Sequence, residues 1–413
     1  MTTKFHNSFK FLDWQLHNST CQLHLSYAMQ DIGKVTETLI LPKFINKFST
    51  KRSKAINAAC QLLHLVCGVS YYKAGLANNI QLQQPTSKTV ADFVSKTWYH
   101  GLAELAYVNH VSLAGKCQIP ATGKSPIATN LTLSNKALVA IGGGKDSLVT
   151  IEALRQQGKD LCLFFVGNAP LIKQVIAATG LPSLQVLRKI DTKLLDYNQK
   201  GAFNGHIPIT AINSCVAVLV ALLFDFDNIV FSNESSADSA NTINKEGQEV
   251  NHQYSKSHEF EKDLCHVIHK EISPSLHYYS YLRQLSELQV LQKFAKLEQY
   301  FRVFSSCNRN FHLDGSHNKQ NRWCCDCPKC RFVFLGMAAF ATRQNVLKIF
   351  QHDMLDDATQ FDGFAQLLGI DGIKPFECVG TIQESQQALD LIAAKPEWRS
   401  SKLLLKLTQE LHK

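Results

Sequence analysis

A glycine-rich stretch near the middle of the chain has the residue types of a phosphate-binding loop. An apolar run, "ALVAI", leads into it, and an amphipathic run, "SLVTIEALRQQG", follows it. Glycines let a phosphate approach backbone N–H groups, and a helix start adds free N–H donors and the positive end of its dipole. The stretch is therefore a candidate phosphate site, with a turn that binds no ligand as the alternative. Its residues are Gly142, Gly143, Gly144, Lys145, Asp146 and Ser147.

A second polar cluster, "FSNESSADSAN", follows a later apolar run and includes Asn233 and Glu234. The segments "NGHIPITAIN" and "VNHQYSKS" flank it and contribute His206, His252 and Lys256. Imidazole and ammonium groups of this kind could bind anionic substrate groups or move protons. A solvated or buried structural role is the alternative for each histidine taken alone.

The third cluster is made of cysteines. Cys324, Cys327 and Cys330 have C-x₂-C-x₂-C spacing, Cys307 lies upstream, and Cys325 is left over. Four thiolates suit a tetrahedral Zn²⁺ ion, and a reducing compartment favours metal ligation over disulfides. The spacing therefore predicts a structural zinc site, with buried local thiols or an iron–sulfur cluster as alternatives.

The elements around these clusters alternate between strands and helices. In parallel sheets of this kind, ligands bind beyond the carboxyl ends of the strands, and the glycine loop and the 233–241 cluster both follow a strand. We therefore expect an α/β fold with a doubly wound parallel sheet. The predicted strands are 137–141, 161–167 and 184–191, and a fourth strand with its following loop is predicted over 228–236. The predicted helices are 147–158, 170–180 and 208–224.

Length and composition predict a multidomain globular protein. A chain of 413 residues is too long to fold around a single compact core, and 45% of its residues are hydrophobic. We expect an α+β N-terminal domain over 1–125, a nucleotide-binding domain over 126–245, and a mainly helical C-terminal domain with the cysteines over 246–413. A helix is expected at 286–304. The net charge of +9 suits anionic partners, and the absence of a signal-like segment or a membrane-length apolar run predicts a cytoplasmic protein.

The loop resembles the S-G-G-x-D-S pyrophosphate loop of the N-type ATP pyrophosphatases. Gly142 stands where that superfamily has a serine, whereas Gly143, Gly144, Asp146 and Ser147 match its pattern. The resemblance implies an adenine nucleotide alpha-hydrolase-like fold and cleavage of ATP to AMP and pyrophosphate. It also implies that Asp146 lies near Mg²⁺.

A closer resemblance covers residues from about 90 to 385. "GLAELAYVN", "GHIPITAINS", "SNESSA", "VNHQYSKSHEFE", "CCDCPKCRFVFL" and "KPFECVG", in this order, resemble the ATP-dependent epimerase of UDP-N-acetylmuramoyl-L-alanyl-L-glutamate. That family inverts the terminal L-glutamate to D-glutamate in peptidoglycan precursor synthesis. The resemblance implies a small nucleotide-sugar peptide as substrate. We expect neither a membrane nor nucleic acid as partner, because the longest apolar run is too short to span a membrane and no recognition helix stands out.

The residues suit this chemistry. Removing the Cα proton of a carboxylate accumulates negative charge, and adenylation of the carboxylate removes that obstacle. One or two proton-handling groups must then act at Cα, and the sequence does not choose among the candidates. These candidates are His206, His252, Lys256, Glu377 and Cys378. Lys145 and Asp146 of the glycine loop are also predicted to be catalytic residues.

Two other functions remain open from the sequence. One is another N-type ATP pyrophosphatase, such as 7-cyano-7-deazaguanine synthase or a tRNA-modifying enzyme. The cysteines and the basic charge favour it, whereas "VNHQYSKS" and "KPFECVG" do not. The other is a nucleic-acid-binding module built on the cysteines, which leaves the glycine loop unexplained.

Overall fold

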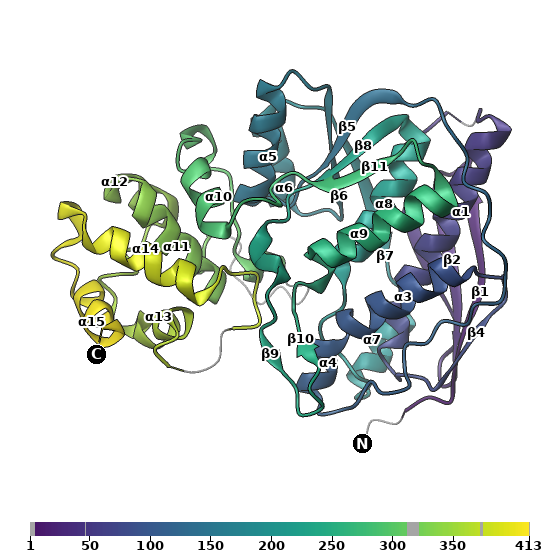
Figure 1. Cartoon of the computed structure of the whole chain (residues 1–413), viewed down its shortest axis with the longest axis horizontal. Coiled ribbons are helices and arrows are strands. Elements are labelled where there is room, and N and C mark those ends of the chain that lie inside the picture. Colours follow the sequence, from purple (N-terminus) through teal and green to yellow (C-terminus); the bar gives the residue numbers. More distant parts are fainter. Residues whose placement is uncertain (1–4, 46, 312–321, 372–374, 413) are drawn as a thin grey trace.

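A nine-stranded sheet organises the part of the chain that the computed structural model describes, residues 5–45, 47–311, 322–371 and 375–412 (Figure 1). Its order is β11-β8-β5-β6-β7-β3-β2-β1-β4, and five of its eight strand pairs are parallel. The predicted α/β class is therefore confirmed. The strands are β1 Ser8–His17, β2 Gln22–Met29, β3 Gly33–Ile40, β4 Asn79–Leu82, β5 Ser134–Ala140, β6 Leu161–Val166, β7 Ser183–Lys189, β8 Phe226–Phe231 and β11 His277–Ser280.

The central strands are buried on both faces, as their apolar runs predict. On β5, Leu138 belongs to one hydrophobic core while Val139 belongs to the other, and Phe164 and Phe165 divide in the same way on β6. Helices cover each face (Figure 1). On one side these are α1 Thr50–Cys67, α3 Lys88–Gly101, α8 Ile209–Phe224 and α9 His258–Val267, and on the other α5 Lys145–Gln156, α6 Pro170–Thr179 and α10 Glu287–Phe294.

The N-terminal strands extend this sheet. Strand β3 pairs antiparallel with β7, so the sheet continues across the expected domain boundary at residue 125. A buried ion pair joins the two strands, because Arg188 Nε and Nη2 donate to the Glu37 carboxylate at 2.6 and 2.9 Å. Arg188 Nη2 also donates to Ser70 Oγ at 2.7 Å. The first two expected domains thus share one sheet.

One expectation for the C-terminal third needs correction. The segment is mainly helical, as expected, although its short strand β11 pairs with β8 at the edge of the central sheet. The helix expected over 286–304 ends at Phe294. The chain then folds back, so that the ring centroids of Phe294 and Phe304 lie 4.4 Å apart. A continuous helix would separate two residues ten positions apart by about 15 Å, so packing of these rings decides against it.

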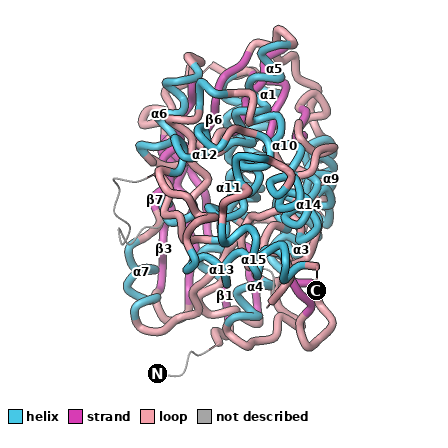
Figure 2. Tube along the Cα trace, turned by 90° about the vertical axis from the view of Figure 1, so that its left-hand side faces the viewer, coloured by secondary structure: helices cyan, strands magenta, loops and turns pink. Residues whose placement is uncertain are grey.

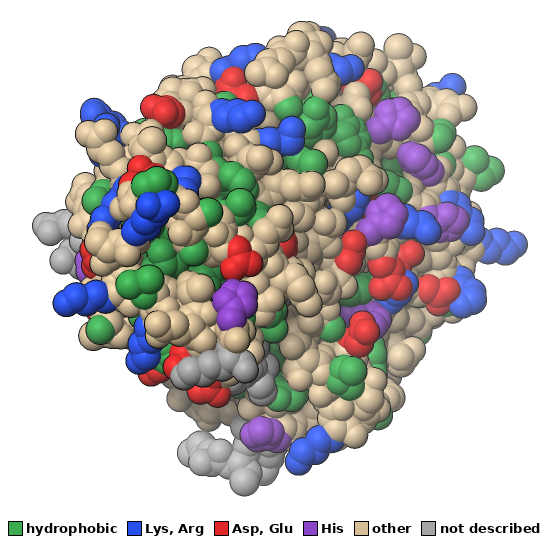
Figure 3. Space-filling view, turned by 60° about the vertical axis from the view of Figure 1, so that its left-hand side comes forward, with side chains coloured by type: hydrophobic (Ala, Val, Ile, Leu, Met, Phe, Trp, Pro, Cys, Tyr) green, Lys and Arg blue, Asp and Glu red, His purple; other side chains and the backbone are tan. Residues whose placement is uncertain are grey.

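Short helices also lie at α2 Val69–Tyr72, α4 Ala103–Val108 and α7 Thr192–Gln199. The helices between residues 328 and 411 form a C-terminal group beside the sheet, seen in front of it in Figure 2. No helix in the described ranges is long and apolar enough to cross a membrane. On the face drawn in Figure 3, basic side chains are interspersed with acidic ones rather than gathered in one patch. The helices of the group are α11 Pro328–Phe340, α12 Arg343–Phe350, α13 Phe361–Leu368, α14 Ile382–Ala393 and α15 Lys402–Leu411.

Candidate active site

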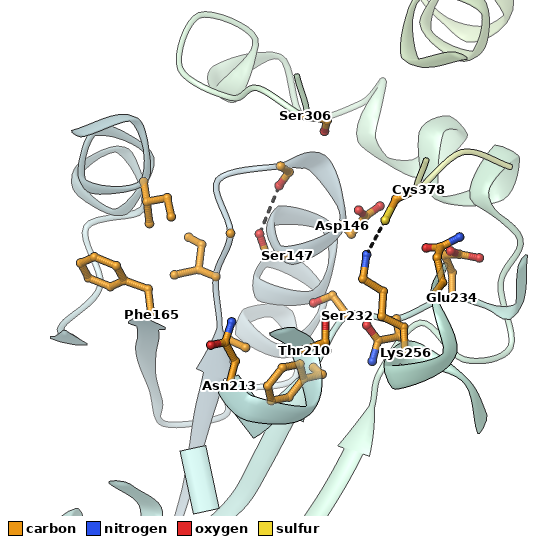
Figure 4. Close-up of a pocket in the computed structure, with 18 of the residues that line it drawn as sticks. Asp146, Ser147, Phe165, Thr210, Asn213, Ser232, Glu234, Lys256, Ser306 and Cys378 are labelled. Atoms are coloured by element: carbon orange, nitrogen blue, oxygen red, sulfur yellow. Dashed lines mark hydrogen bonds between the residues drawn. The ribbon is translucent and has the colours of Figure 1, made fainter. Parts of the chain in front are cut away.

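A cavity of about 330 Å³ opens at the carboxyl ends of the central parallel strands (Figure 4). Strands β7-β6-β5-β8-β11 have the order 3-2-1-4-5 when numbered along the chain. The connection direction reverses between β5 and β8, and ligands in open α/β sheets bind in the crevice at such a point. The glycine loop follows β5, and Asn233 and Glu234 follow β8, so the topology brings two of the predicted clusters to one cavity.

The glycine loop forms one wall of the cavity. Gly142, Gly144, Asp146 and Ser147 line it, and Gly144 precedes the first turn of α5. Among the described residues, no side chain caps that turn, so its N–H groups remain available to an anion. Gly143 has a φ of +81°, a conformation that side-chain-bearing residues rarely adopt. A loop of this geometry could bind a phosphate group.

Lys145, a predicted catalytic residue of the loop, lies behind this wall. Its side chain is fully buried, and its ammonium group pairs with Asp146 and Glu287. Lys329, which the sequence reasoning missed, lines the cavity instead and pairs with Glu287 at 2.9 Å. Burial alone would raise the pKa of Glu287, but the two ammonium groups lower it to about 2. The Glu287 carboxylate therefore forms ion pairs with two lysines, Lys145 of the loop and Lys329 of the cysteine-rich segment.

Three polar atoms of the cavity lining are buried and have no hydrogen-bond partner among the described residues. They are Asn213 Oδ1, Ser232 Oγ and Ser306 Oγ. Ser306 lies close to the loop, because its Oγ would be 3.0 Å from a Cβ placed on Gly144. Buried polar atoms without partners are costly, so this lining suits a polar ligand.

Asn233 and Glu234, in the cluster after β8, both line the cavity. Asn233 Nδ2 donates to Ser280 Oγ at 3.0 Å, which fixes the end of β8 to β11. Burial raises the pKa of Glu234 to about 8, and the neighbouring carboxylates of Glu287 and Asp146 add to the effect. Glu234 and Asp146 both line the cavity, so two carboxylates there could share a divalent cation such as Mg²⁺.

Four of the predicted proton-handling groups come together next to the cavity; Lys256 and Cys378 line it, whereas His206 and His252 are not among its lining residues. Lys256 Nζ donates to Cys378 Sγ at 3.0 Å, and both side chains line the cavity (Figure 4). His252 Nδ1 lies 2.5 Å from Glu104 Oε2, and His206 Nδ1 lies 3.9 Å from the same oxygen. The structure thus brings together four candidates that are dispersed over more than 170 positions in the sequence.

The two imidazoles have opposite protonation tendencies. Burial and the neighbouring His252 lower the pKa of His206 to about 4. Burial would also lower the pKa of His252, but hydrogen bonds to Cys378 and Glu104 raise it to about 9. At neutral pH one ring is therefore a proton acceptor and the other a proton donor, which is the pattern of paired acid and base groups.

The Cys378 thiol is acidic for a buried cysteine. Burial alone would raise its pKa, but the Lys256 charge and the hydrogen bond with His252 lower it to about 6. Glu377, the remaining candidate, accepts a hydrogen bond from Asn308 Nδ2, and burial and the adjacent Cys378 raise its pKa. Cys378 is therefore largely a thiolate at neutral pH.

Residues that sequence reasoning missed complete the site. Glu104 had a signal, because it lies in the "GLAELAYVN" segment of the family resemblance, but its spacing pointed to no function. Glu287 and Ser306 lie in no recognised motif, and Lys329 lies between two cysteines that drew attention to metal binding alone.

The four predicted cysteine ligands also meet. The sulfur atoms of Cys307, Cys324, Cys327 and Cys330 all lie within 4.8 Å of one another, and those of Cys324 and Cys330 are 3.6 Å apart. A tetrahedral zinc–thiolate centre has sulfur–sulfur edges of about 3.8 Å. The donor set and its spacing therefore fit Zn²⁺, and Cys325 stays outside the group.

Comparison with known proteins gives a consistent result over nearly the whole chain. Family models of the MurL N-terminal domain and the MurL C-terminal domain match residues 1–281 and 303–413. A Xanthomonas oryzae pv. oryzae protein named UDP-N-acetyl-alpha-D-muramoyl-L-alanyl-L-glutamate epimerase is 42% identical over 98% of this chain and 90% of its own length. Proteins of the same name from Salinispora tropica and a Micromonospora species are each 40% identical over 96% of this chain, and the matches cover 87% and 89% of those proteins.

Proposed function

This chain belongs to the MurL family, and on that premise we propose that it inverts the terminal L-glutamate of UDP-MurNAc-L-Ala-L-Glu to D-glutamate, using ATP and Mg²⁺. The near-full-length similarity to three proteins named as epimerases of this substrate carries the proposal. The same similarity favours it over a deazaguanine synthase or a tRNA-modifying enzyme. The reaction would belong to peptidoglycan precursor synthesis, and a cytoplasmic location, where ATP and nucleotide sugars are made, is part of the proposal.

The cavity supports ATP as the second substrate. The cavity lies where the strand order reverses, as nucleotide sites in such sheets do. The uncapped first turn of α5 could bind the phosphates on the glycine loop, and the polar atoms without partners could bind other parts of the nucleotide. We assign the adenine nucleotide alpha-hydrolase-like fold on these grounds. Asp146 and Glu234 would hold Mg²⁺, which supplies charge neutralisation on the phosphates when it is bound. Lys329 would add a fixed positive charge at the same end of the cavity.

The reaction would begin when the α-carboxylate of the terminal glutamate attacks the α-phosphorus of ATP. Pyrophosphate leaves, and the resulting acyl adenylate no longer carries the negative charge that opposes Cα deprotonation. Lys329 and the N–H groups of the first turn of α5 stabilise the leaving pyrophosphate. Transfer of the acyl group to water completes the reaction, whose products are AMP, pyrophosphate and the inverted glutamate substrate.

The imidazole pair would handle the Cα proton on one face of the substrate. The ring centroids of His206 and His252 are 4.2 Å apart, which is too close for a carbon centre to lie between them. The pair therefore serves a single face, with neutral His206 suited to accept a proton and His252 suited to donate one. The opposite face falls to another group, and Lys256 and Cys378 are the nearest candidates.

The cysteine cluster would bind a structural Zn²⁺ ion. The ion would neutralise the thiolates of Cys307, Cys324, Cys327 and Cys330 and tie the 303–311 segment to the start of α11. Lys329 lies between two of these ligands, and Ser306 precedes a third. The cluster would thereby hold two cavity-lining residues in place.

A single assay tests the proposed reaction. The protein is incubated in D₂O with ATP, Mg²⁺ and UDP-MurNAc-L-Ala-L-Glu, and the substrate without its glutamate serves as a control. We expect AMP, pyrophosphate, D-glutamate after acid hydrolysis, and deuterium at Cα, all dependent on ATP. Formation of AMP with a deazapurine or tRNA, but not with this substrate, would refute the proposal.

A further inference from the structure

Cys378 has the surroundings of an activated nucleophile. Its Sγ accepts a hydrogen bond from Lys256 Nζ at 3.0 Å, and it interacts with His252. His252 is in turn held by Glu104 at 2.5 Å. A thiol beside an imidazole that a third group orients is the arrangement of nucleophilic catalysis, in which the imidazole sets the protonation state of the thiol.

The thiol also lies in the cavity of the glycine loop. Cys378 and Asp146 both line it, and Lys329 Nζ donates to the backbone oxygen of Cys378 while it pairs with Glu287. Glu287 pairs with Lys145 of the loop, so a chain of three buried charged groups fixes the thiol relative to the glycine loop. A carboxylate that reacts at the α-phosphorus would therefore have this thiol within the same small volume.

The electrostatics favour nucleophilic attack over proton abstraction. The thiolate is held by two cationic partners, Lys256 and His252, which makes it a weak base toward a carbon-bound proton. A low-pKa thiolate is still a good nucleophile and a good leaving group, so it can both form and release an acyl bond.

Building on the proposed ATP-dependent activation, we propose that Cys378 takes the glutamyl acyl group from the adenylate as a thioester. Sγ attacks the carbonyl carbon, a C–S bond forms, and the C–O bond to AMP breaks with its electron pair leaving on AMP. A thioester donates less electron density to its carbonyl than a carboxylate or an oxygen ester does. The neighbouring Cα–H is therefore acidified while the substrate stays attached to the enzyme.

The later steps then divide among the neighbouring groups. The imidazole pair and Lys256 exchange the Cα proton, and water attacks the thioester carbonyl as an imidazole accepts its proton. The C–S bond breaks, the thiolate of Cys378 returns to its starting state, and the product carboxylate is released. Cys378 is thus a catalytic residue that forms a covalent bond, and Glu104 is a positioning residue that acts through His252.

Rapid quenching tests the covalent step. The enzyme is mixed with ATP, Mg²⁺ and UDP-MurNAc-L-Ala-L-Glu, quenched in acid within one turnover, and analysed by intact-protein mass spectrometry. We expect a mass increase equal to the substrate minus one water, located on the peptide that contains Cys378 and removed by neutral hydroxylamine. Cys162→Ala, which removes a thiol from β6 that does not line this cavity, should form the same adduct.

Exchange of labelled pyrophosphate into ATP separates this inference from the proposed function. Cys378→Ala should keep substrate-dependent exchange, which also shows that the variant is folded, but lose the adduct and at least 100-fold of epimerisation. Glu104→Gln should form the adduct more slowly and shift the pH profile of its formation. AMP formation by the wild type without an adduct, or epimerisation by Cys378→Ala within tenfold of the wild type, would overturn the thioester. Absence of exchange in the wild type would refute adenylation itself, and the thioester with it.

Discussion

Lys329 Nζ lies 2.9 Å from Glu287 Oε1, which places an ammonium group from the cysteine-rich segment inside the cavity of the glycine loop. Glu287 also pairs with Lys145, so one carboxylate joins the loop to a segment more than 180 residues later. Both partners of the Lys329–Glu287 pair are almost fully buried. Through this ion pair the cysteine-rich segment contributes a side chain to the candidate active site.

Substitution Glu287→Gln should destabilise the protein strongly. It leaves the buried ammonium groups of Lys145 and Lys329 without their shared carboxylate, and breaking a buried ion pair in this way costs about 3–5 kcal/mol. Urea unfolding of the variant measures the loss, and the exposed Glu249→Gln substitution is the control. Equal unfolding midpoints for Glu287→Gln and the wild type would contradict the role of this carboxylate.

Substitution Asp146→Ala should abolish AMP formation while the fold is retained. Its carboxylate lines the cavity at the start of α5, where we propose that it binds Mg²⁺. We expect a loss of about 100-fold or more in AMP formation, by analogy with removal of one electrostatic contact to a reacting group. The exposed Asp160→Ala is the control, and circular dichroism checks the fold. Unchanged turnover would rule out the assigned role.

Substitution Ser306→Ala should weaken ATP binding without loss of stability. The Ser306 hydroxyl has no hydrogen-bond partner among the described residues, so its removal breaks no contact in the free protein. If it donates to a phosphate, its loss should raise KM for ATP by about tenfold. A Cβ on Gly142 meets no atom within 4 Å, so Gly142→Ser in the Ser306→Ala background can restore a hydroxyl at the loop. We expect partial recovery of KM, and an unaltered KM in Ser306→Ala would refute the contact.

Alkylation of Cys378 should report its lowered pKa. Because the thiolate is the reactive form and its pKa is about 6, the rate with iodoacetamide should fall about tenfold per pH unit below pH 6 and level off above pH 7. An ordinary cysteine, whose pKa is near 9, would still gain reactivity from pH 7 to 9. Peptide mapping locates the label. Lys256→Met should move the transition to higher pH, and an identical profile in that variant would exclude Lys256 as a cause.

Elemental analysis of the purified protein should find about one zinc per chain. Removal of the metal should lower the unfolding temperature and raise KM for ATP, because Lys329 lies between two proposed ligands, Cys327 and Cys330. Cys327→Ser should reproduce both effects, whereas Cys325→Ser, outside the group of four, should retain the zinc. A metal-free protein that is folded and fully active would defeat the assignment.

Local sequence patterns determined much of this protein. Apolar runs that alternate with amphipathic ones predicted the parallel α/β core, because helix and strand periodicities depend on residues a few positions apart. The glycine loop was recognisable for the same reason, since its backbone freedom and its place before a helix are local properties. Family membership, inferred from segments spread between about 90 and 385, is confirmed by the comparisons.

Only the tertiary structure decided which side chains share the site. Glu104 meets His252 across 148 positions, and Lys145 meets Glu287 across 142. Such contacts depend on the path of the whole chain and leave no spacing in the sequence. The structure also set Lys145 behind the loop and placed Lys329 in the cavity, because the shared carboxylate of Glu287 and its burial fix where each charge lies. Local motifs thus predicted where the site lies in the sequence. Long-range ion pairs and packing, which only the folded chain brings about, determined which side chains surround it.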